Sequence, residues 1–216
     1  MKTILITGST SGIGLGIAIE FAKTKQYNIV FNGLEPNGQE IADGIAKQYG
    51  IEVMYSNANM LQPAELRKMV DDAVAKFGKI DVLVNNAGIQ FVSPIEDFPE
   101  DKWNAIIGIN LTSAFHLTKA VWKGMKERKF GRIINIASAH GLVASEFKSA
   151  YVASKHGIVG FTKTIALEGA PFGITANAIC PGYVKTPLVE KQIADQAKAH
   201  SMSEADVVNK VMLYKQ

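Results

Sequence analysis

The sequence predicts one α/β domain, a Rossmann-type doubly wound parallel sheet flanked by helices. Short runs rich in β-branched residues alternate with longer segments of helical period along the 216-residue chain. The short runs are apolar on both faces, which is typical of strands buried in a parallel sheet. No repeat, low-complexity tract or Pro/Gly/Ser-rich linker divides the chain, so we predict a single domain over residues 1–216.

In the first half of the chain, each apolar run is followed by a segment in which apolar residues recur every three or four positions. Parallel strands joined in this way need right-handed helical crossovers. The predicted strands are 3–6, 28–32, 52–56 and 82–84, and the predicted helices are 13–25, 39–49 and 63–77.

The second half continues the alternation and then changes in texture. We predict a long helix over 102–128, a strand over 132–136, a helix over 150–170 and a strand over 175–179. Beyond Gly182 the chain is more polar. Thr186 and Pro187 begin a further helical stretch, and Ser203 with Asp206 predicts the cap of a last helix that runs toward Tyr214. No pattern for a seventh strand follows.

Composition argues against several classes of protein. The net charge of +3 is small and its cations are spread along the chain, so we expect no nucleic-acid partner. Cys180 is the single cysteine, which excludes an internal disulfide and fits a reducing cytoplasm. No apolar stretch is long enough to cross a membrane. The histidines lack the spacing of metal ligands, so we predict no metal site; they are His116, His140, His156 and His200.

A glycine-rich turn joins the first predicted strand to the first predicted helix. Gly8, Gly12 and Gly14 follow the pattern Gly-x-x-x-Gly-x-Gly. Glycines let backbone approach a pyrophosphate, and the N-terminus of a helix supplies free N–H groups and partial positive charge. Turns commonly contain glycine, but the place of this one between the first strand and helix favours a nucleotide site.

Further motifs follow in order, and together with the turn they resemble the short-chain dehydrogenase/reductase family over nearly the whole chain. Residues 85–88 read Asn-Asn-Ala-Gly after the fourth strand, Asn110 lies within the long helix, and Ser138 follows the fifth strand. Tyr151 and Lys155 then open a helix, and Pro181-Gly182 follows the sixth strand. The resemblance implies a nicotinamide dinucleotide cofactor held by Gly8, Thr10, Ser11, Gly12, Ile13, Gly14, Leu34, Asn59, Met60, Asn86, Ala87, Gly88, Tyr151, Lys155, Pro181, Gly182 and Val184.

The choice between NAD and NADP depends on the end of the second strand. Residues 32–35, Asn-Gly-Leu-Glu, should pass the adenosine ribose, and a 2′-phosphate there would need an Arg or Lys. None occurs here or in the glycine-rich turn, so we predict NAD. The ribose-binding aspartate usual at this strand end is missing, and we interpret Glu35 as a solvated turn residue.

Tyr151 and Lys155 are four residues apart and share one face of a helix. A neighbouring ammonium and a nicotinium charge both favour the phenolate form of a tyrosine. The resemblance implies that Tyr151 exchanges a proton with the substrate hydroxyl and that Lys155 lowers the tyrosine pKa and binds the nicotinamide ribose. It further implies that Ser138 hydrogen-bonds the reacting oxygen and that Asn110 holds a relay water. Taken singly, each residue has a structural alternative: a helix-surface pair, a strand end or a buried amide.

The substrate is predicted from a closer resemblance within the family. Segments 86–90, 137–145, 148–151 and 181–192 resemble the bacterial D-3-hydroxybutyrate dehydrogenases. In those enzymes two glutamines, a histidine and a lysine grip the substrate carboxylate and acyl body. A small hydroxy acid must be oriented through its carboxylate by a cation and amide donors. Alone, Lys148 or His140 could be a solvated loop residue. The implied substrate residues are Gln90, Ser138, His140, Lys148, Tyr151 and Gln192.

Two other functions stay open, and the length of the chain bears on both. One is a 3-oxoacyl carrier-protein reductase that uses NADPH, and the other is a nucleotide-binding module without turnover. Members of the family normally continue with another helix, a final strand and a segment that caps the substrate pocket. We therefore expect an open pocket and a bare sheet edge, in either a fragment or a natural truncation. The long helices resemble those at the core of the family's oligomers, which implies a homotetramer.

Overall fold

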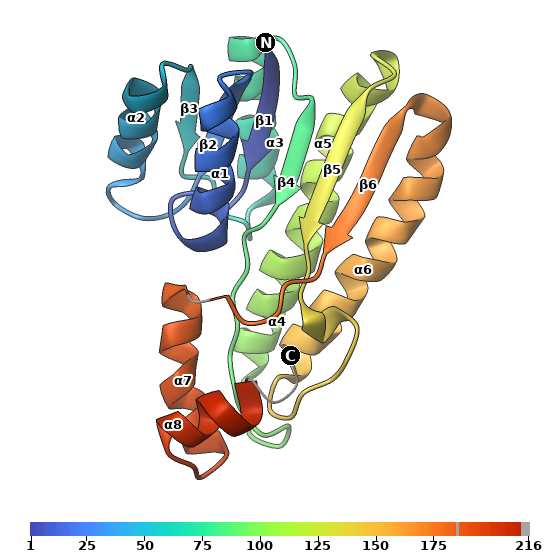
Figure 1. Cartoon of the computed structure of the whole chain (residues 1–216). Coiled ribbons are helices and arrows are strands. Elements are labelled where there is room, and N and C mark those ends of the chain that lie inside the picture. The colour runs from blue at the N-terminus through green and yellow to red at the C-terminus, as the bar shows by residue number, and fades with distance from the viewer. Residues whose placement is uncertain (185, 213–216) are drawn as a thin grey trace.

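The computed structural model is a six-stranded parallel sheet with helices on both faces (Figure 1). It describes residues 1–184 and 186–212, except for the side chains of 187–188, 191–192 and 211–212. The strand order is β3-β2-β1-β4-β5-β6, which is the order of the doubly wound Rossmann fold. The strands are β1 (Lys2–Ile6), β2 (Tyr27–Asn32), β3 (Val53–Ser56), β4 (Val82–Asn85), β5 (Gly131–Ile136) and β6 (Ile174–Ile179).

The predicted helices are present with boundaries within a few residues of those expected. Three of them end at a residue in the left-handed conformation, namely Lys25, Gly50 and Gly78. The helices are α1 (Gly12–Thr24), α2 (Gly38–Tyr49), α3 (Pro63–Phe77), α4 (Glu100–Ile107), α5 (Ser113–Glu127), α6 (Ser149–Gly169), α7 (Pro187–Ala199) and α8 (Glu204–Asp206). Single turns of 3₁₀ helix lie at Ala139–Gly141 and Ala170–Phe172, and a π-helix, Val207–Met212, follows α8.

The long helix predicted over 102–128 contains a π-helical turn. This turn, Gly108–Thr112, joins α4 to α5 without breaking the run of helical residues. A π-turn takes in one more residue than an α-turn and is often found at functional sites. Asn110 lies in its middle and is almost fully buried.

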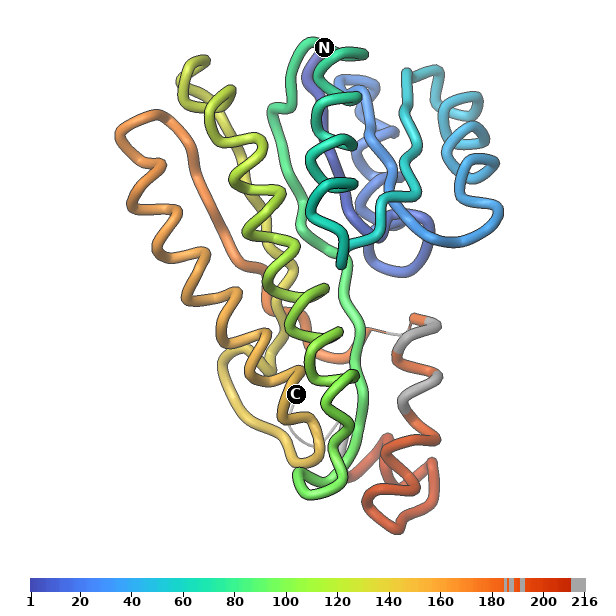
Figure 2. Tube along the Cα trace, turned by 180° about the vertical axis from the view of Figure 1, so that it is seen from behind, coloured from blue at the N-terminus to red at the C-terminus, as the bar shows by residue number. Residues whose placement is uncertain are grey.

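Two hydrophobic cores lie on the two faces of the sheet because neighbouring strand residues point to opposite sides. Ile4 and Ile6 pack against α1 and α2, while Leu5 between them packs with α3 and α5. The front view shows α1 and α2 over one half of the sheet, and the view from behind shows α3 and α5 on the other face (Figure 2). Both faces of the central strands are thereby buried.

The far edge of the described sheet is less covered. On β6, Thr175, Asn177 and Ile179 are exposed on one face, and no described strand pairs with the outer side of β6. This agrees with the expected bare edge. After β6 the chain crosses below the sheet to α7 and α8, which project away from it (Figure 1). Thr186 caps α7 and Ser203 caps α8, as the sequence predicts.

Candidate active site

A cavity of about 700 Å³ lies at the carboxyl ends of the strands, where β1 and β4 meet at the reversal of strand order. Ligands of doubly wound sheets bind at this point. We call one end of the cavity, formed by residues 8–13, 32–35 and 58–60, the glycine-loop end. The opposite end, formed by residues 136–155 and 181–184, is the lysine end.

The backbone conformation and the close contacts at the glycine-loop end favour glycine. Gly8 and Gly12 have positive φ angles of 59° and 54°. A Cβ on Gly14 would lie 2.2 Å from the Gly8 carbonyl oxygen, so helix α1 starts directly against the loop. The N–H groups at its start and the bare backbone form a cradle that a dinucleotide pyrophosphate fits.

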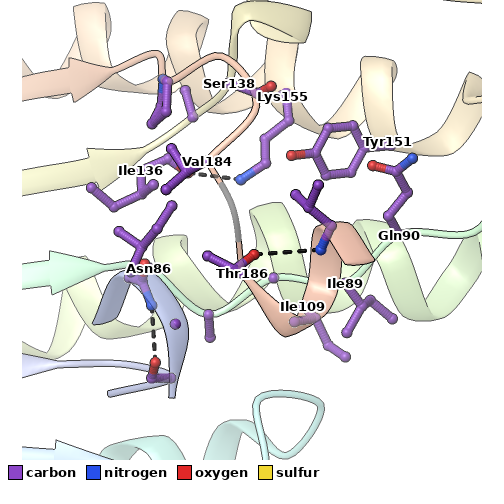
Figure 3. A pocket seen from close by; sticks show the side chains of 18 of the residues that line it. Asn86, Ile89, Gln90, Ile109, Ile136, Ser138, Tyr151, Lys155, Val184 and Thr186 are labelled. Atoms are coloured by element: carbon purple, nitrogen blue, oxygen red, sulfur yellow. Dashed lines mark hydrogen bonds between the residues drawn. The ribbon is translucent and has the colours of Figure 1, made fainter. Parts of the chain in front are cut away.

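The loop after β4 is tied to the glycine loop by hydrogen bonds. The Asn86 side chain donates to the Thr7 carbonyl oxygen at 2.8 Å and to that of Gly8 at 3.0 Å, as Figure 3 shows in part. The Thr7 hydroxyl accepts from the backbone N–H groups of Asn86 and Ala87, both at 2.9 Å. These bonds fix residues 86–88 along one wall of the cavity.

At the lysine end, α6 directs Tyr151 and Lys155 toward the cavity (Figure 3). The Lys155 amine donates to the Ile136 carbonyl oxygen at 2.7 Å and lies 5.5 Å from the centre of the Tyr151 ring. Burial lowers the pKa of Lys155 to about 8. Burial raises the pKa of Tyr151, and a hydrogen bond with Ser138 acts in the opposite direction. No lowering of the Tyr151 pKa by Lys155 is seen in the chain alone, so that effect stays a prediction for the complex with cofactor.

Asn110 supports the site from behind and does not line the cavity. Its Oδ1 accepts from the Ile89 N–H at 2.9 Å, and its Nδ2 donates to the Ile89 carbonyl oxygen at 3.0 Å and to Ser154 Oγ at 3.1 Å. The Ser154 hydroxyl donates to the Tyr151 carbonyl oxygen at 2.8 Å. The π-turn thus connects the loop after β4 to the helix that carries Tyr151.

Lys148 lies just before α6 and is only 1% exposed. Its amine donates to the Tyr183 hydroxyl at 2.6 Å, and burial lowers its pKa to about 8. No carboxylate in the described part of the chain pairs with it. Tyr183 lines the cavity, and its ring lies edge-on to the ring of His140. Among the described residues, Lys148 is therefore a buried cation beside the cavity that has no carboxylate partner.

Most predicted site residues line this one cavity. Exceptions are Thr10 and Gly14, which are buried within the glycine-rich turn, and the supporting Asn110 and Lys148. The Gln192 side chain is outside the described residues. Those that line the cavity are Gly8, Ser11, Gly12, Ile13, Leu34, Asn59, Met60, Asn86, Ala87, Gly88, Gln90, Ser138, His140, Tyr151, Lys155, Pro181, Gly182 and Val184.

Among the residues of the site that were not predicted from the sequence, three polar side chains stand out by their contacts. Glu35 lines the glycine-loop end and bonds to Thr10 and Ser11, which corrects its interpretation as a solvated turn residue. Tyr183 bonds Lys148. Gln196 on α7 is fully buried, and burial raises the pKa of Tyr183. Lys148 and Tyr183 are 35 residues apart in the sequence, so no local sequence pattern could have indicated their contact.

The part of the chain that the structure describes gives no sign of two other kinds of site. No helix within it has the length and apolar character needed to cross a membrane. No cluster of three or more His, Cys, Asp or Glu side chains within it is placed to hold a metal ion.

Comparison with known proteins agrees with this geometry. The family model of the short chain dehydrogenases matches residues 2–197. A D-beta-hydroxybutyrate dehydrogenase of Rhizobium meliloti is 54% identical over 98% of this chain and 83% of its own length. One of Cupriavidus necator is 54% identical over the whole chain and 83% of its own length. A crystal structure of a variant actinorhodin polyketide ketoreductase with NADPH superposes with a TM-score of 0.89 at 35% identity, and covers 95% of this chain and 79% of that one.

Proposed function

The chain belongs to the short-chain dehydrogenase family and has the fold of an oxidoreductase of that family, and on this premise we propose that it oxidises D-3-hydroxybutyrate to acetoacetate with NAD. The buried amine of Lys148, which donates to Tyr183 but pairs with no carboxylate among the described residues, carries the proposal. A buried cation is costly unless an anion pairs with it. This one precedes Tyr151 by three residues, so a carboxylate bound near it would hold a short hydroxy acid with its hydroxyl close to the phenol.

The chain's own residues would perform the proton chemistry. Tyr151 accepts the proton of the substrate hydroxyl, and Ser138 hydrogen-bonds the same oxygen while charge develops on it. The Lys155 ammonium, 5.5 Å from the Tyr151 ring centre, favours the phenolate that forms. Bound NAD⁺ supplies the acceptor for the hydride that leaves carbon 3. The products are acetoacetate, NADH and the proton that Tyr151 passes to solvent.

The glycine-loop end supports NAD over NADP. Among the described residues that line this end, none is Lys or Arg, which a 2′-phosphate would need. The one ionisable side chain there is the carboxylate of Glu35. The two 54% identical relatives named as hydroxybutyrate dehydrogenases support the substrate, whereas the ketoreductase, which is named with NADPH, is 35% identical.

The decisive experiment is a comparison of substrates with the purified chain. We expect the highest kcat/KM for D-3-hydroxybutyrate with NAD⁺, at least a hundredfold above the L-enantiomer or above NADP⁺. The L-enantiomer cannot place its carboxylate and its hydroxyl correctly at the same time, and the 2′-phosphate of NADP⁺ meets no Lys or Arg among the described residues of the glycine-loop end. Faster reduction of a 3-oxoacyl thioester with NADPH would make the protein an oxoacyl reductase. Binding of NADH without turnover of any hydroxy or keto acid would make it a nucleotide-binding module.

We also propose that the chain forms a homo-oligomer through the outer faces of α5 and α6. A second cavity of about 670 Å³ lies between these helices, with Phe115, Trp122 and Phe161 in its wall. Lysines and glutamates line the same groove, so a second copy related by a two-fold axis would meet it with opposite charges. Light scattering of the wild type and of Trp122→Glu measures the molar mass of each in solution. A monomeric wild type contradicts the proposed homo-oligomer.

A further inference from the structure

Gln196 on α7 is a fully buried side chain whose amide makes no hydrogen bond with the described residues. Both its nitrogen and its oxygen are shielded from solvent. Burial of an amide without partners lowers the stability of a protein, whereas burial of an apolar side chain of similar size does not. The preceding residue, Asp195, is exposed. Packing alone therefore does not explain a glutamine at position 196.

The neighbour of this amide is the Tyr183 hydroxyl. The two groups lie side by side, although their geometry falls short of a hydrogen bond. The Tyr183 oxygen also accepts from the Lys148 amine at 2.6 Å. An ammonium only donates, so the hydroxyl hydrogen of Tyr183 needs a separate acceptor. The Gln196 oxygen is a buried acceptor at this place, and the last torsion of a glutamine side chain turns readily.

The same helix also contacts the residue that precedes Lys148. The ring of His200, at the end of α7, lies edge-on to the ring of Phe147, with 5.0 Å between their centres. Phe147 has a positive φ of 62°, which is unfavourable for a bulky side chain. Contacts from α7 thus reach both the residue before Lys148 and the hydroxyl that Lys148 bonds. The position of the Lys148 amine therefore depends on α7.

We propose that Gln196 is a positioning residue for the substrate: its amide oxygen accepts the hydrogen of the Tyr183 hydroxyl and thereby fixes Tyr183 and the Lys148 amine. Gln196 does not line the cavity, whereas Tyr183 does, so Gln196 acts through Tyr183. This role differs from the direct substrate contact implied for Gln192, which lies four residues earlier. The inference rests on the proposed function, in which the Lys148 amine lies near the substrate carboxylate.

Gln196→Leu separates this role from one in packing, because leucine has a similar volume and no amide. D-3-hydroxybutyrate should bind the NADH-saturated variant about fivefold more weakly, with kcat within about twofold of the wild type. The urea midpoint should equal or exceed that of the wild type, because a buried amide without partners is removed. A lower midpoint with unchanged affinity would make Gln196 a structural residue and overturn the inference.

Asp195→Asn is the matched control, since Asp195 is the exposed neighbour of Gln196 on α7. It should change neither the substrate affinity nor the urea midpoint. An equal loss of affinity in this control would assign the effect to α7 as a whole and contradict a specific role of Gln196.

A double-mutant cycle with Tyr183→Phe tests the route of the effect. If Gln196 acts through the Tyr183 hydroxyl, Gln196→Leu should weaken substrate binding no further once that hydroxyl is absent. The double variant should then bind D-3-hydroxybutyrate as Tyr183→Phe does. Equal losses in both backgrounds would mean that the two residues act independently, and the proposed contact would be wrong.

The contact can also be measured without substrate, by NMR of protein isotope-labelled at the tyrosine ring carbon that bears the hydroxyl. The Tyr183 signal is identified by its absence from Tyr183→Phe. It should shift in Gln196→Leu and stay in place in Asp195→Asn. An unmoved signal in Gln196→Leu would overturn the inference, whatever the substrate is. Failure of the wild type to bind D-3-hydroxybutyrate, with the signal shifted, would contradict the proposed function and leave the contact in place.

Discussion

The two ends of the cavity satisfy their polar groups in different ways. At the glycine-loop end, the Ser9 hydroxyl donates to the Ile6 carbonyl oxygen at 2.8 Å and accepts from the Asn32 N–H at 2.9 Å, and Glu35 accepts from neighbouring hydroxyls. At the lysine end, Lys148 and Lys155 are buried, and no carboxylate in the described residues pairs with either. The carboxylate at the first end accepts hydrogen bonds from the chain itself, whereas the two ammonium groups at the second end donate to neutral groups, the Tyr183 hydroxyl and the Ile136 carbonyl oxygen.

This difference between the two ends indicates that cofactor binding depends on the glycine-loop end and that the chemistry depends on the lysine end. A backbone cradle with internal hydrogen bonds can be preformed at little electrostatic cost. Two buried cations lower the stability of the free protein, because desolvation disfavours their charged forms. They become favourable when an anion or a cofactor lies beside them. Substitutions at the lysine end should therefore change chemistry and substrate affinity, while those at the glycine-loop end should change cofactor affinity and stability.

The largest effect is expected for Tyr151→Phe. Loss of the phenolic hydroxyl removes the proton acceptor, and kcat for D-3-hydroxybutyrate should fall about a thousandfold. NADH binding, measured by fluorescence, should change by less than about twofold because the glycine-loop end is intact. A variant that keeps a tenth of the wild-type kcat would contradict the phenol's role at the lysine end.

Lys148→Met should weaken substrate binding about a hundredfold, since it removes a buried charge that bonds the carboxylate. The wild type should also show a pH dependence of its own. The pKa of Lys148 is lowered to about 8, so its ammonium is present below pH 8 and is lost as the pH rises through that value. Affinity should be constant below pH 8 and fall up to tenfold per pH unit above it.

The measurement is binding of D-3-hydroxybutyrate to the enzyme saturated with NADH, a complex that cannot turn over. The Lys148→Met variant serves as the control, because its weak binding should not vary with pH in this range. An equal loss of affinity above pH 8 in the variant would assign the titration to another group, such as Lys155.

At the glycine-loop end, Gly14→Ala should lower stability and NADH affinity together. The new Cβ would lie 2.2 Å from the Gly8 carbonyl oxygen and 2.5 Å from Asn86 Nδ2, so backbone has to move. We expect a loss of about 2 kcal/mol in the free energy of unfolding. Gly16→Ala in the same helix meets nothing within 4 Å and should be neutral or stabilising by up to about 1 kcal/mol. Urea unfolding of both variants checks this, and equal losses would contradict the close contact.

The smallest effect is expected for Tyr183→Phe, which removes the hydroxyl that accepts from Lys148. The amine keeps its charge and its place, so KM should rise a few-fold, about 1 kcal/mol, with kcat nearly unchanged. Steady-state kinetics of Tyr183→Phe and Tyr151→Phe, measured side by side, distinguish the roles of the two phenols at the lysine end. A loss of kcat as large as that of Tyr151→Phe would mean that Tyr183 takes part in the proton transfer.

The order of strands and helices could be predicted from the sequence because it follows from local periodicity. The predicted strand over 28–32 is extended by one residue in β2, and the predicted helix over 63–77 coincides with α3. The glycine loop and the Tyr151–Lys155 pair could be predicted equally well, since each lies within one short segment of the sequence. The resemblance to a known family then supplied what each segment could do.

Features that depend on contacts across the sheet could not be predicted. Glu35 looked solvated because its partners, Thr10 and Ser11, approach only after β1 and β2 have paired. Tyr183 looked like an ordinary loop residue because Lys148 lies far from it in sequence. The π-turn around Asn110 could not be predicted, because the sequence of Gly108–Thr112 carries no local pattern that distinguishes a π-turn from an α-helical turn.

That turn makes the length of the helical segment from Glu100 to Glu127 a matter of function as well as of packing. One residue in an α-helix corresponds to about 100° of rotation. Deletion of a single residue here would restore regular α-helical bonding and swing Asn110 away from Ile89, so the loop after β4 and the helix bearing Tyr151 would lose their shared amide. Natural variation in this family should therefore tolerate exchanges of side chain along α4 and α5 far better than a gain or loss of one position.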